Sequence, residues 1–259
     1  MGERTQYTPG TFCWTDLNTT DQEAAKAFYE ELFGWSTTDL PVGDGVFYTM
    51  ASLDGKPVAA IATQPQQQRD AGAPPSWNSY VSVDSADAVL ERARELGGVV
   101  HAGAFDVMQA GRMGVLQDPQ GAHLIVWEAK DHFGAQLVNT SGALTWNELA
   151  SPDLEASGRF YSALFGWAIE PIEDTEMPYH QIKNAAGWNN GGIRPAMPGE
   201  PPHWGVYFGT GNLDDSLERL QQLGGRKLLG PMPAGPGTFA VVQDPQGAAF
   251  VLYTGAFED

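Results

Sequence analysis

The chain has 259 residues, 42% of them hydrophobic and 18% charged, which is typical of a globular protein large enough for one or two cores. Its formal net charge of −18 excludes nucleic acid as a partner, because phosphates need lysine and arginine, and it disfavours an anionic membrane surface. Cys13 is the only cysteine, so neither an intrachain disulfide nor a CxxC metal site can form. With no signal peptide and no run of roughly 20 apolar residues, we expect a cytoplasmic protein.

The first predicted elements are a strand over residues 12–17 and the helix that follows it. Thr20 and Glu23 match a capping box, with Thr20 as the N-cap. The helix itself is predicted from apolar residues at helical spacing, namely Ala24, Ala25, Phe28 and Leu32. Gly34 is expected to end it, because glycine readily takes the left-handed conformation of a helix C-cap.

Short strands over residues 46–53 and 58–63 are expected next, followed by a proline-rich segment over residues 64–75. A second unit begins with a strand that is predicted over residues 77–83. The helix after it, over residues 85–96, has apolar residues on one face and ends at a pair of glycines. These elements make a second unit of the same kind as the first.

The sequence DPQG occurs twice, at residues 118–121 and 244–247, each time with apolar runs on both sides. Such a sequence predicts a type I turn within a β-hairpin. The rest of the chain repeats as well, since the strand and helix around Trp14 return around Trp146, 132 positions later. In the second copy we expect Ser151 to be the helix N-cap, with proline at the first helical position.

The repeats predict four βαβββ units in an α+β fold of two tandem halves. The first domain is expected over residues 1–131 and the second over residues 143–259, with a linker over residues 132–142. Trp14 and Trp146 should occupy equivalent positions, with length differences absorbed in loops, because a one-residue slip within a strand would invert its faces.

This layout, with FY inside the first helix, FGW closing it and DPQG in the last hairpin, resembles the vicinal oxygen chelate superfamily. That superfamily includes glyoxalase I, bleomycin-resistance proteins and extradiol dioxygenases. The resemblance covers about residues 11–253 and extends to tandem-domain actinobacterial proteins called glyoxalase-like or hydroxylase, a group that includes a mycobacterial antigen. It implies glyoxalase-like domains whose curved sheets enclose clefts.

The resemblance also implies where a catalytic metal is bound in metal-dependent members. Each half would supply a histidine on the first strand of its first unit, a histidine on the first strand of its second unit, and a glutamate on its last strand. At these places this chain has Trp14, Asn78 and Ile125 in the first half, and Trp146, Gly205 and Val251 in the second. None of these side chains is a usual metal ligand, so we expect no metal and no other cofactor.

Strand side chains alternate between faces, so Trp14 and Asp16 should point into the first cleft, and Trp146 and Glu148 into the second. Each tryptophan can be an aromatic wall for a flat ligand, or a plug in the space that a metal occupies elsewhere. Each carboxylate can be a general base in an apolar cleft, or a solvated group at the end of a strand.

Other candidate residues surround these four. His180 and His203 are candidates to pair with Glu148, although an isolated histidine is more often structural. Arg112 can hold an anionic or carbonyl ligand or form a surface salt bridge. The predicted catalytic residues are Glu148 and His180, and the predicted ligand-binding residues are Trp14, Asp16, Asn78, Arg112, Ile125, Trp146, His203 and Tyr207.

The sequence favours a protein that binds a small organic molecule, aromatic or dicarbonyl, in metal-free clefts, as a monomer or homodimer. The second cleft should be the more polar and the one used. One alternative is an enzyme of the same superfamily, a metal-independent hydroxylase, isomerase or lyase or a glyoxalase, with Glu148 as acid or base. Another is a non-catalytic interaction protein whose clefts are vestigial.

Overall fold

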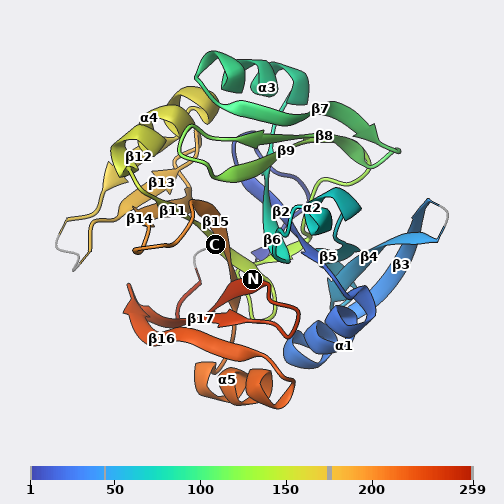
Figure 1. Ribbon diagram of the computed structural model, residues 1–259. Coiled ribbons are helices and arrows are strands. Elements are labelled where there is room, and N and C mark those ends of the chain that lie inside the picture. Colours follow the sequence, from blue (N-terminus) through green and yellow to red (C-terminus); the bar gives the residue numbers. More distant parts are fainter. Residues whose placement is uncertain (1, 44, 174–176, 258–259) are drawn as a thin grey trace.

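The computed structural model describes residues 2–43, 45–173 and 177–257 (Figure 1). It contains two mixed sheets of eight strands each, which lie back to back. In spatial order the first sheet comprises β3 (Ser36–Gly43), β4 (Val46–Leu53), β5 (Lys56–Thr63), β2 (Phe12–Thr19), β6 (Ser76–Ser82), β9 (His123–Ala129), β8 (Gly111–Gln117) and β7 (Val99–Val107). The second comprises β12 (Ala168–Pro171), β13 (His180–Lys183), β14 (Asn189–Pro195), β11 (Leu144–Ser151), β15 (His203–Gly209), β18 (Ala249–Thr254), β17 (Gly237–Gln243) and β16 (Arg226–Ala234).

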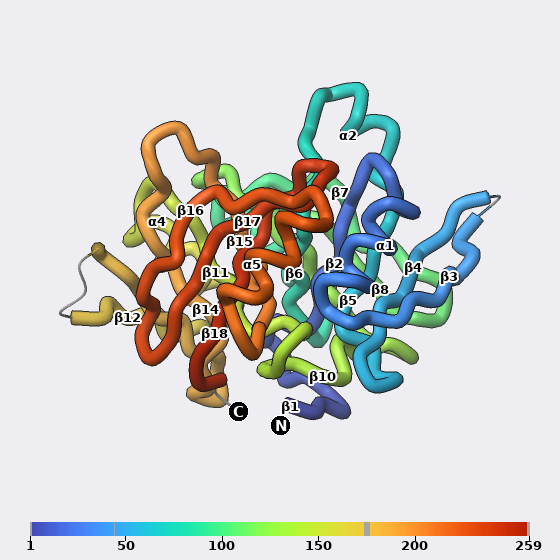
Figure 2. Tube along the Cα trace, turned by 90° about the horizontal axis from the view of Figure 1, so that it is seen from below, coloured from blue at the N-terminus to red at the C-terminus, as the bar shows by residue number. Residues whose placement is uncertain are grey.

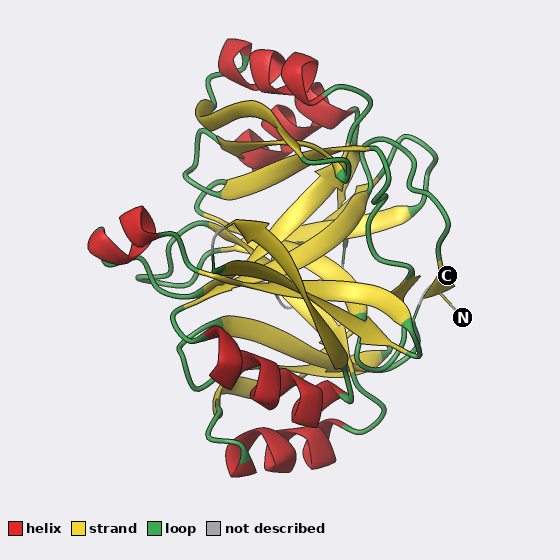
Figure 3. Cartoon of the chain, turned by 90° about the vertical axis from the view of Figure 1, so that its right-hand side faces the viewer, coloured by secondary structure: helices red, strands yellow, loops and turns green. Residues whose placement is uncertain are grey.

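Four helices complete the repeat, one after the first strand of each unit. They are α1 (Gln22–Phe33), α3 (Ala86–Glu95), α4 (Leu154–Phe165) and α5 (Leu213–Gln222). Each unit therefore reads βαβββ, and the prediction of two tandem α+β halves is confirmed. A short extra helix, α2 (Gln66–Asp70), lies in the proline-rich segment and protrudes from the body of the protein (Figure 3). No helix of the described residues is long and apolar enough to cross a membrane.

The two halves have the same strand register at the predicted site. Trp14 lies opposite Tyr80 and Trp146 opposite Tyr207, and each ladder has its irregularity just before the tryptophan. The expectation that the two tryptophans occupy equivalent positions is confirmed by these pairings.

Both first-unit helices begin later than the sequence predicted. Asp21 and Asp153 are the N-caps, and their carboxylates accept the backbone N–H of Ala24 and Ala156. The predicted caps at Thr20 and Ser151 are therefore wrong. An aspartate at the N-cap, whose carboxylate accepts the backbone N–H three residues later, is as good a cap as serine or threonine. Ser151 instead accepts the N–H of Asp153 through its hydroxyl, one step outside the helix.

The helices pair across the two halves, α1 with α5 and α3 with α4 (Figure 3). Tyr29 on α1 donates a hydrogen bond of 3.0 Å to Asp244, and Tyr161 on α4 donates one of 2.9 Å to Asp118. These are the tyrosine of each FY pair and the aspartate of the DPQG turn in the other half. The two motifs that define the repeat therefore hold one half against the other.

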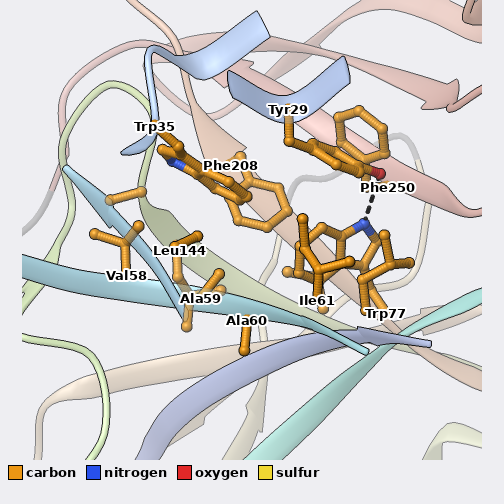
Figure 4. Close-up of a cluster of buried hydrophobic side chains, with 14 of the residues drawn as sticks. Tyr29, Trp35, Val58, Ala59, Ala60, Ile61, Trp77, Leu144, Phe208 and Phe250 are labelled. Atoms are coloured by element: carbon orange, nitrogen blue, oxygen red, sulfur yellow. Dashed lines mark hydrogen bonds between the residues drawn. The ribbon is translucent and has the colours of Figure 1, made fainter. Parts of the chain in front are cut away.

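The core between the halves is strongly aromatic. Figure 4 shows Tyr29 and Trp35 of the first half packed against Phe208 and Phe250 of the second. Trp77 closes this group and donates a hydrogen bond of 3.0 Å from its indole to the hydroxyl of Tyr29. Because tyrosine and tryptophan bury large rings yet keep a polar group that needs a partner, these bonds fix how the rings pack.

The connection between the halves lies against the first sheet. Within it, β10 (Leu137–Val138) pairs with β1 (Gly2–Glu3), on the side of the molecule where both chain ends lie (Figure 2). The N–H of Ala135 donates to the carbonyl of Cys13, which attaches this segment to the strand that carries Trp14. Cys13 itself is fully buried.

Candidate functional site

In the first half, Trp14 and Asp16 lie on the same face of β2, as strand alternation predicted. Tyr48 on β4 links them, because its hydroxyl accepts from the indole of Trp14 at 3.0 Å and donates to Asp16 at 3.1 Å. Trp14 is 2% exposed and Asp16 is 4% exposed. The tryptophan and the carboxylate therefore form one buried hydrogen-bonded unit.

Neutral donors surround the carboxylate of Asp16. Tyr80 donates to it at 2.6 Å and the amide of Asn78 at 2.8 Å, in addition to Tyr48. Burial raises the pKa of Asp16, and the hydrogen bonds from Tyr80, Asn78 and Tyr48 offset only part of that rise. Burial and the neighbouring Asp16 also raise the pKa of Tyr48 and Tyr80 well above the usual range, so both hydroxyls stay protonated.

The segment that connects the halves covers this first network. The imidazole of His132 meets Trp14 edge-on, with ring centroids 4.5 Å apart, and its backbone carbonyl accepts from the indole of Trp127. Burial lowers the pKa of His132 to about 4, so the ring is neutral near pH 7. Trp14 is thus covered by the protein's own chain.

In the second half, Trp146 and Glu148 occupy the equivalent places. The indole of Trp146 donates to the hydroxyl of Tyr179 at 3.0 Å, and Tyr207 donates to Glu148 at 2.7 Å. Burial and the adjacent Glu148 carboxylate raise the pKa of both tyrosines well above the usual range. Trp146 is partly exposed and the side chain of Glu148 is 12% exposed, so this network is the more accessible of the two.

The second network also contains a cation. Arg194 on β14 donates to Glu148 at 2.9 Å and forms a two-bond pair with Glu200 at 2.6 and 2.8 Å. Its carboxylate partners keep the pKa of Arg194 above its ordinary value despite burial. His203 lies at the rim, with its Nε2 atom 3.9 Å from Glu200. The carboxylate of Glu148 is therefore charge-balanced, which that of Asp16 is not.

Two predicted site residues lie apart from these networks. His180 follows Tyr179 directly and so points to the opposite face of the sheet, where its Nε2 atom lies 3.7 Å from Glu155 on α4. The expected pairing of His180 with Glu148 is not formed. Arg112 forms a two-bond ion pair with Asp87, at 2.8 and 3.1 Å, which is the salt-bridge alternative that the sequence left open.

The remaining candidates lie in or next to the networks. Asn78 and Tyr207 bond the two carboxylates, and Ile125 lies opposite Tyr80 in the parallel ladder of β6 and β9. The sequence reasoning missed Tyr48, Tyr80, Tyr179, Arg194 and Glu200. One signal was available, because Tyr80 and Tyr207 follow Trp77 and Trp204 by three residues in both halves.

The donor chemistry at the expected metal positions does not suit a catalytic metal. Trp14 and Trp146 present indole N–H groups that donate to tyrosines, and the carboxylates beside them are bonded by tyrosine, asparagine or arginine. Within residues 2–43, 45–173 and 177–257 no three histidine, cysteine or acidic side chains converge as a metal site. The residues at these positions therefore do not fit a catalytic metal.

Two family models match the chain. The glyoxalase/bleomycin resistance protein/dioxygenase superfamily matches residues 11–126, and a glyoxalase-like domain matches residues 146–253. The putative glyoxylase CFP32 of Mycobacterium tuberculosis is 43% identical, over 96% of this chain and 97% of its own. The anthracycline biosynthesis protein DnrV of Streptomyces peucetius is 33% identical, over 95% of this chain and 94% of its own.

Solved structures share the fold at low identity. The Mn(II)-bound glyoxalase of Novosphingobium aromaticivorans has a TM-score of 0.65 at 18% identity, over 98% of this chain and 83% of that one. An extradiol ring-cleaving dioxygenase from B. fuscum has a TM-score of 0.67 at 14% identity, over 98% of this chain and 75% of that one. On the family matches in both halves and the relatives matched along almost its whole length, the chain belongs to the glyoxalase/bleomycin resistance protein/dioxygenase superfamily.

Proposed function

We propose that the chain binds a small organic ligand, aromatic or dicarbonyl, against Trp146 in the second cleft, without a metal. The observation that carries this proposal is the difference in exposure between two equivalent networks. The pair Trp14 and Asp16 is sealed, whereas Trp146 and Glu148 are both partly open to solvent. The protein acts in the cytoplasm as a monomer or homodimer.

The chemistry of the second network suits such a ligand. Trp146 supplies a flat apolar wall, and small-molecule sites usually combine such walls with a few convergent polar groups. A carboxylate has about four lone-pair positions. Arg194 and Tyr207 donate to one oxygen of Glu148, and the hydroxyl of Tyr179 also faces this carboxylate. The remaining acceptor capacity can bind a hydroxyl, an enol or the hydrate of a dicarbonyl.

The names of similar proteins support a small organic ligand. They include a glyoxylase, an anthracycline biosynthesis protein and a ring-cleaving dioxygenase. The solved glyoxalase in that set is bound to Mn(II), whereas the residues at the expected ligand positions here are Trp146, Gly205 and Val251. A ligand of the kind that these names suggest would therefore bind here without the metal.

The ligand site is tested by titration of tryptophan fluorescence with catechol and butane-2,3-dione. Stacking on an indole contributes on the order of 1 kcal/mol beyond area burial, so Trp146→Ala should weaken binding about fivefold. Trp14→Ala is the matched control and should have the smaller effect. If Trp146→Ala binds the probe as tightly as the parent while it remains folded, the tryptophan is only a plug.

The absence of a metal requirement is tested separately. After exhaustive dialysis, elemental analysis should find no stoichiometric zinc, nickel, iron or manganese, and probe binding should be unchanged by added EDTA. About one tightly held metal ion per half would overturn this part of the proposal.

A second candidate function is catalysis by the same network. Glu148 is fixed by Arg194 and Tyr207 beside Trp146, which is the arrangement that a general acid or base needs next to a bound substrate. An isomerase or lyase of this kind would transfer a proton next to a carbonyl group. Turnover that disappears in Glu148→Gln while probe binding persists would favour the enzyme, and absence of both binding and turnover would favour a vestigial cleft.

A further inference from the structure

A second candidate site lies on the opposite face of β13 from Trp146, around His180, which does not form the expected pairing with Glu148. Here a hollow of about 230 Å³ lies between α4 and the strands β12 and β13. Glu155, Gly158 and Arg159 line it from the helix, and His180 lines it from the sheet. His180 is only 9% exposed.

The first half shows what fills the same space there. Gly158 corresponds to Lys26, which lies 132 positions earlier at the same place in the first-unit helix. The ammonium of Lys26 donates to Glu23 at 3.0 Å and to Asp39 at 2.9 Å, and its side chain is only 15% exposed. Asp39 in turn accepts from Thr49 on the neighbouring strand. A half-buried ammonium group therefore occupies this space in the first half.

The second half has no ammonium group at this position, but part of what surrounds that group in the first half is also present here. Glu155 corresponds to Glu23. His180 corresponds to Thr49, because the two residues pair with equivalent isoleucines on the following strand. Pro171 takes the place of Asp39. The Nε2 atom of His180 lies 3.7 Å from Glu155, which is too long for a hydrogen bond and leaves both groups able to bind a third one.

Glycine is an unfavourable choice for this position unless the space is needed. Gly158 lies inside a helix of 12 residues, where glycine destabilises more than any residue except proline. Its backbone does not require glycine, and an added Cβ would meet only Ile169, at 3.7 Å, which is an ordinary contact. A larger side chain would fit here and would fill the hollow.

We infer that this hollow binds the primary ammonium group of a small amine, in the place that Lys26 fills in the first half. Glu155 supplies the countercharge, and a ring nitrogen of His180 accepts one of the three N–H donors. The net charge of −18 attracts cations to the surface generally, and the hollow selects among them. This site is independent of the ligand proposed for Trp146.

The test is ¹H–¹⁵N NMR of the full chain titrated with n-butylammonium chloride at constant ionic strength. Saturable shifts are expected at Gly158 and His180, and Glu155→Gln should weaken them about fivefold, as loss of one partly exposed ion pair does. Gly158→Lys supplies the ammonium covalently and should abolish the shifts. Tetramethylammonium, which has the charge but no N–H donor, should give none.

A reciprocal variant keeps the inference falsifiable if Gly158→Lys is poorly folded. Lys26→Gly empties the matching space in the first half, between Glu23 and Asp39, and should create a second set of saturable shifts there. Equal shifts with tetramethylammonium, or shifts in Gly158→Lys as large as in the parent, would show general attraction to an acidic surface and overturn the inference. Absence of any new shift in Lys26→Gly would contradict the assignment to the vacated lysine position.

Discussion

The two tryptophan–carboxylate networks occupy the same strand positions and yet satisfy their carboxylates in different ways. Asp16 accepts hydrogen bonds from two tyrosines and an asparagine, and Tyr48 links it to Trp14. Glu148 accepts from Tyr207 and from the guanidinium of Arg194, with Tyr179 beside it. Since a carboxylate removed from water needs either donors or a cation, the two halves show both solutions on one scaffold.

Single neighbouring residues decide which solution is used. Arg194 lies at the strand position that Ala62 holds in the first half, and Gly205 lies where Asn78 lies. In the first half an amide donor is present in place of the cation, and the connecting segment covers the site. The second half keeps a charge pair, which is compatible with solvent at its edge, and so remains accessible. In this comparison, the network that contains a cation is also the one that is accessible to solvent.

The largest effect is expected from removing the first carboxylate. Asp16→Ala leaves three buried donors without an acceptor and should lower the free energy of unfolding by about 3 kcal/mol. Glu148→Ala should cost about 1 kcal/mol, because Arg194 keeps its two bonds to Glu200 and solvent reaches the site. Urea unfolding of both variants measures the difference. Equal losses would show that the two networks are energetically equivalent.

The second prediction concerns the pH dependence of stability. Burial raises the pKa of Asp16, so the folded protein retains its proton at pH values where the unfolded chain has lost it. Stability from this group is therefore greatest at low pH and falls as pH rises from about 3.9, the unfolded value, to the raised folded pKa, by about 1.4 kcal/mol for each unit between them. Above the folded pKa it stays level.

Asp16→Asn should remove this fall, whereas Glu148→Gln should leave it in place. Burial also raises the pKa of Asp118 and Asp244, but both remain in all three proteins and cancel in the difference. Denaturation curves collected from pH 4 to pH 7 provide the comparison. If Asp16→Asn has the same pH profile as the parent, Asp16 is ionised in the folded state throughout that range.

Much of the fold follows from short-range signals in the sequence. Helical spacing, Gly34 as C-cap and the DPQG turns each depend on a few adjacent residues, and each was predicted correctly. The N-caps were predicted too early in the chain. Thr20, Asp21 and Ser151 all belong to residue types that cap helices, and composition alone does not rank them. Contacts across the halves, such as Tyr29 with Asp244, have no local signal at all.

The candidate site was predictable only to the extent that it lies on one strand. Trp14 with Asp16 and Trp146 with Glu148 follow from strand alternation along a single segment. Tyr48, Tyr179 and Arg194 come from other strands, and their approach depends on sheet order and register, which the sequence does not state. His180 was expected to pair with Glu148 because it lies on a strand of the third unit, and a shift of one residue in register reverses the face of the sheet on which a side chain lies.

The smallest effect is expected from opening the first cleft. His132 closes it by an edge-on contact with Trp14, and its own pKa, lowered to about 4, means that no charge is lost when it is removed near pH 7. His132→Ala should therefore lower the free energy of unfolding by about 1 kcal/mol or less, the value of one aromatic contact.

In protein labelled with 5-fluorotryptophan, the ¹⁹F resonance of Trp14 should become sensitive to solvent in His132→Ala, as that of Trp146 is expected to be in the parent. His203→Ala is the matched control, because His203 is exposed at the rim of the other cleft and its removal should leave Trp14 unchanged. A Trp14 resonance that stays protected in His132→Ala would mean that packing within the sheet, and not the connecting segment, keeps the first cleft closed.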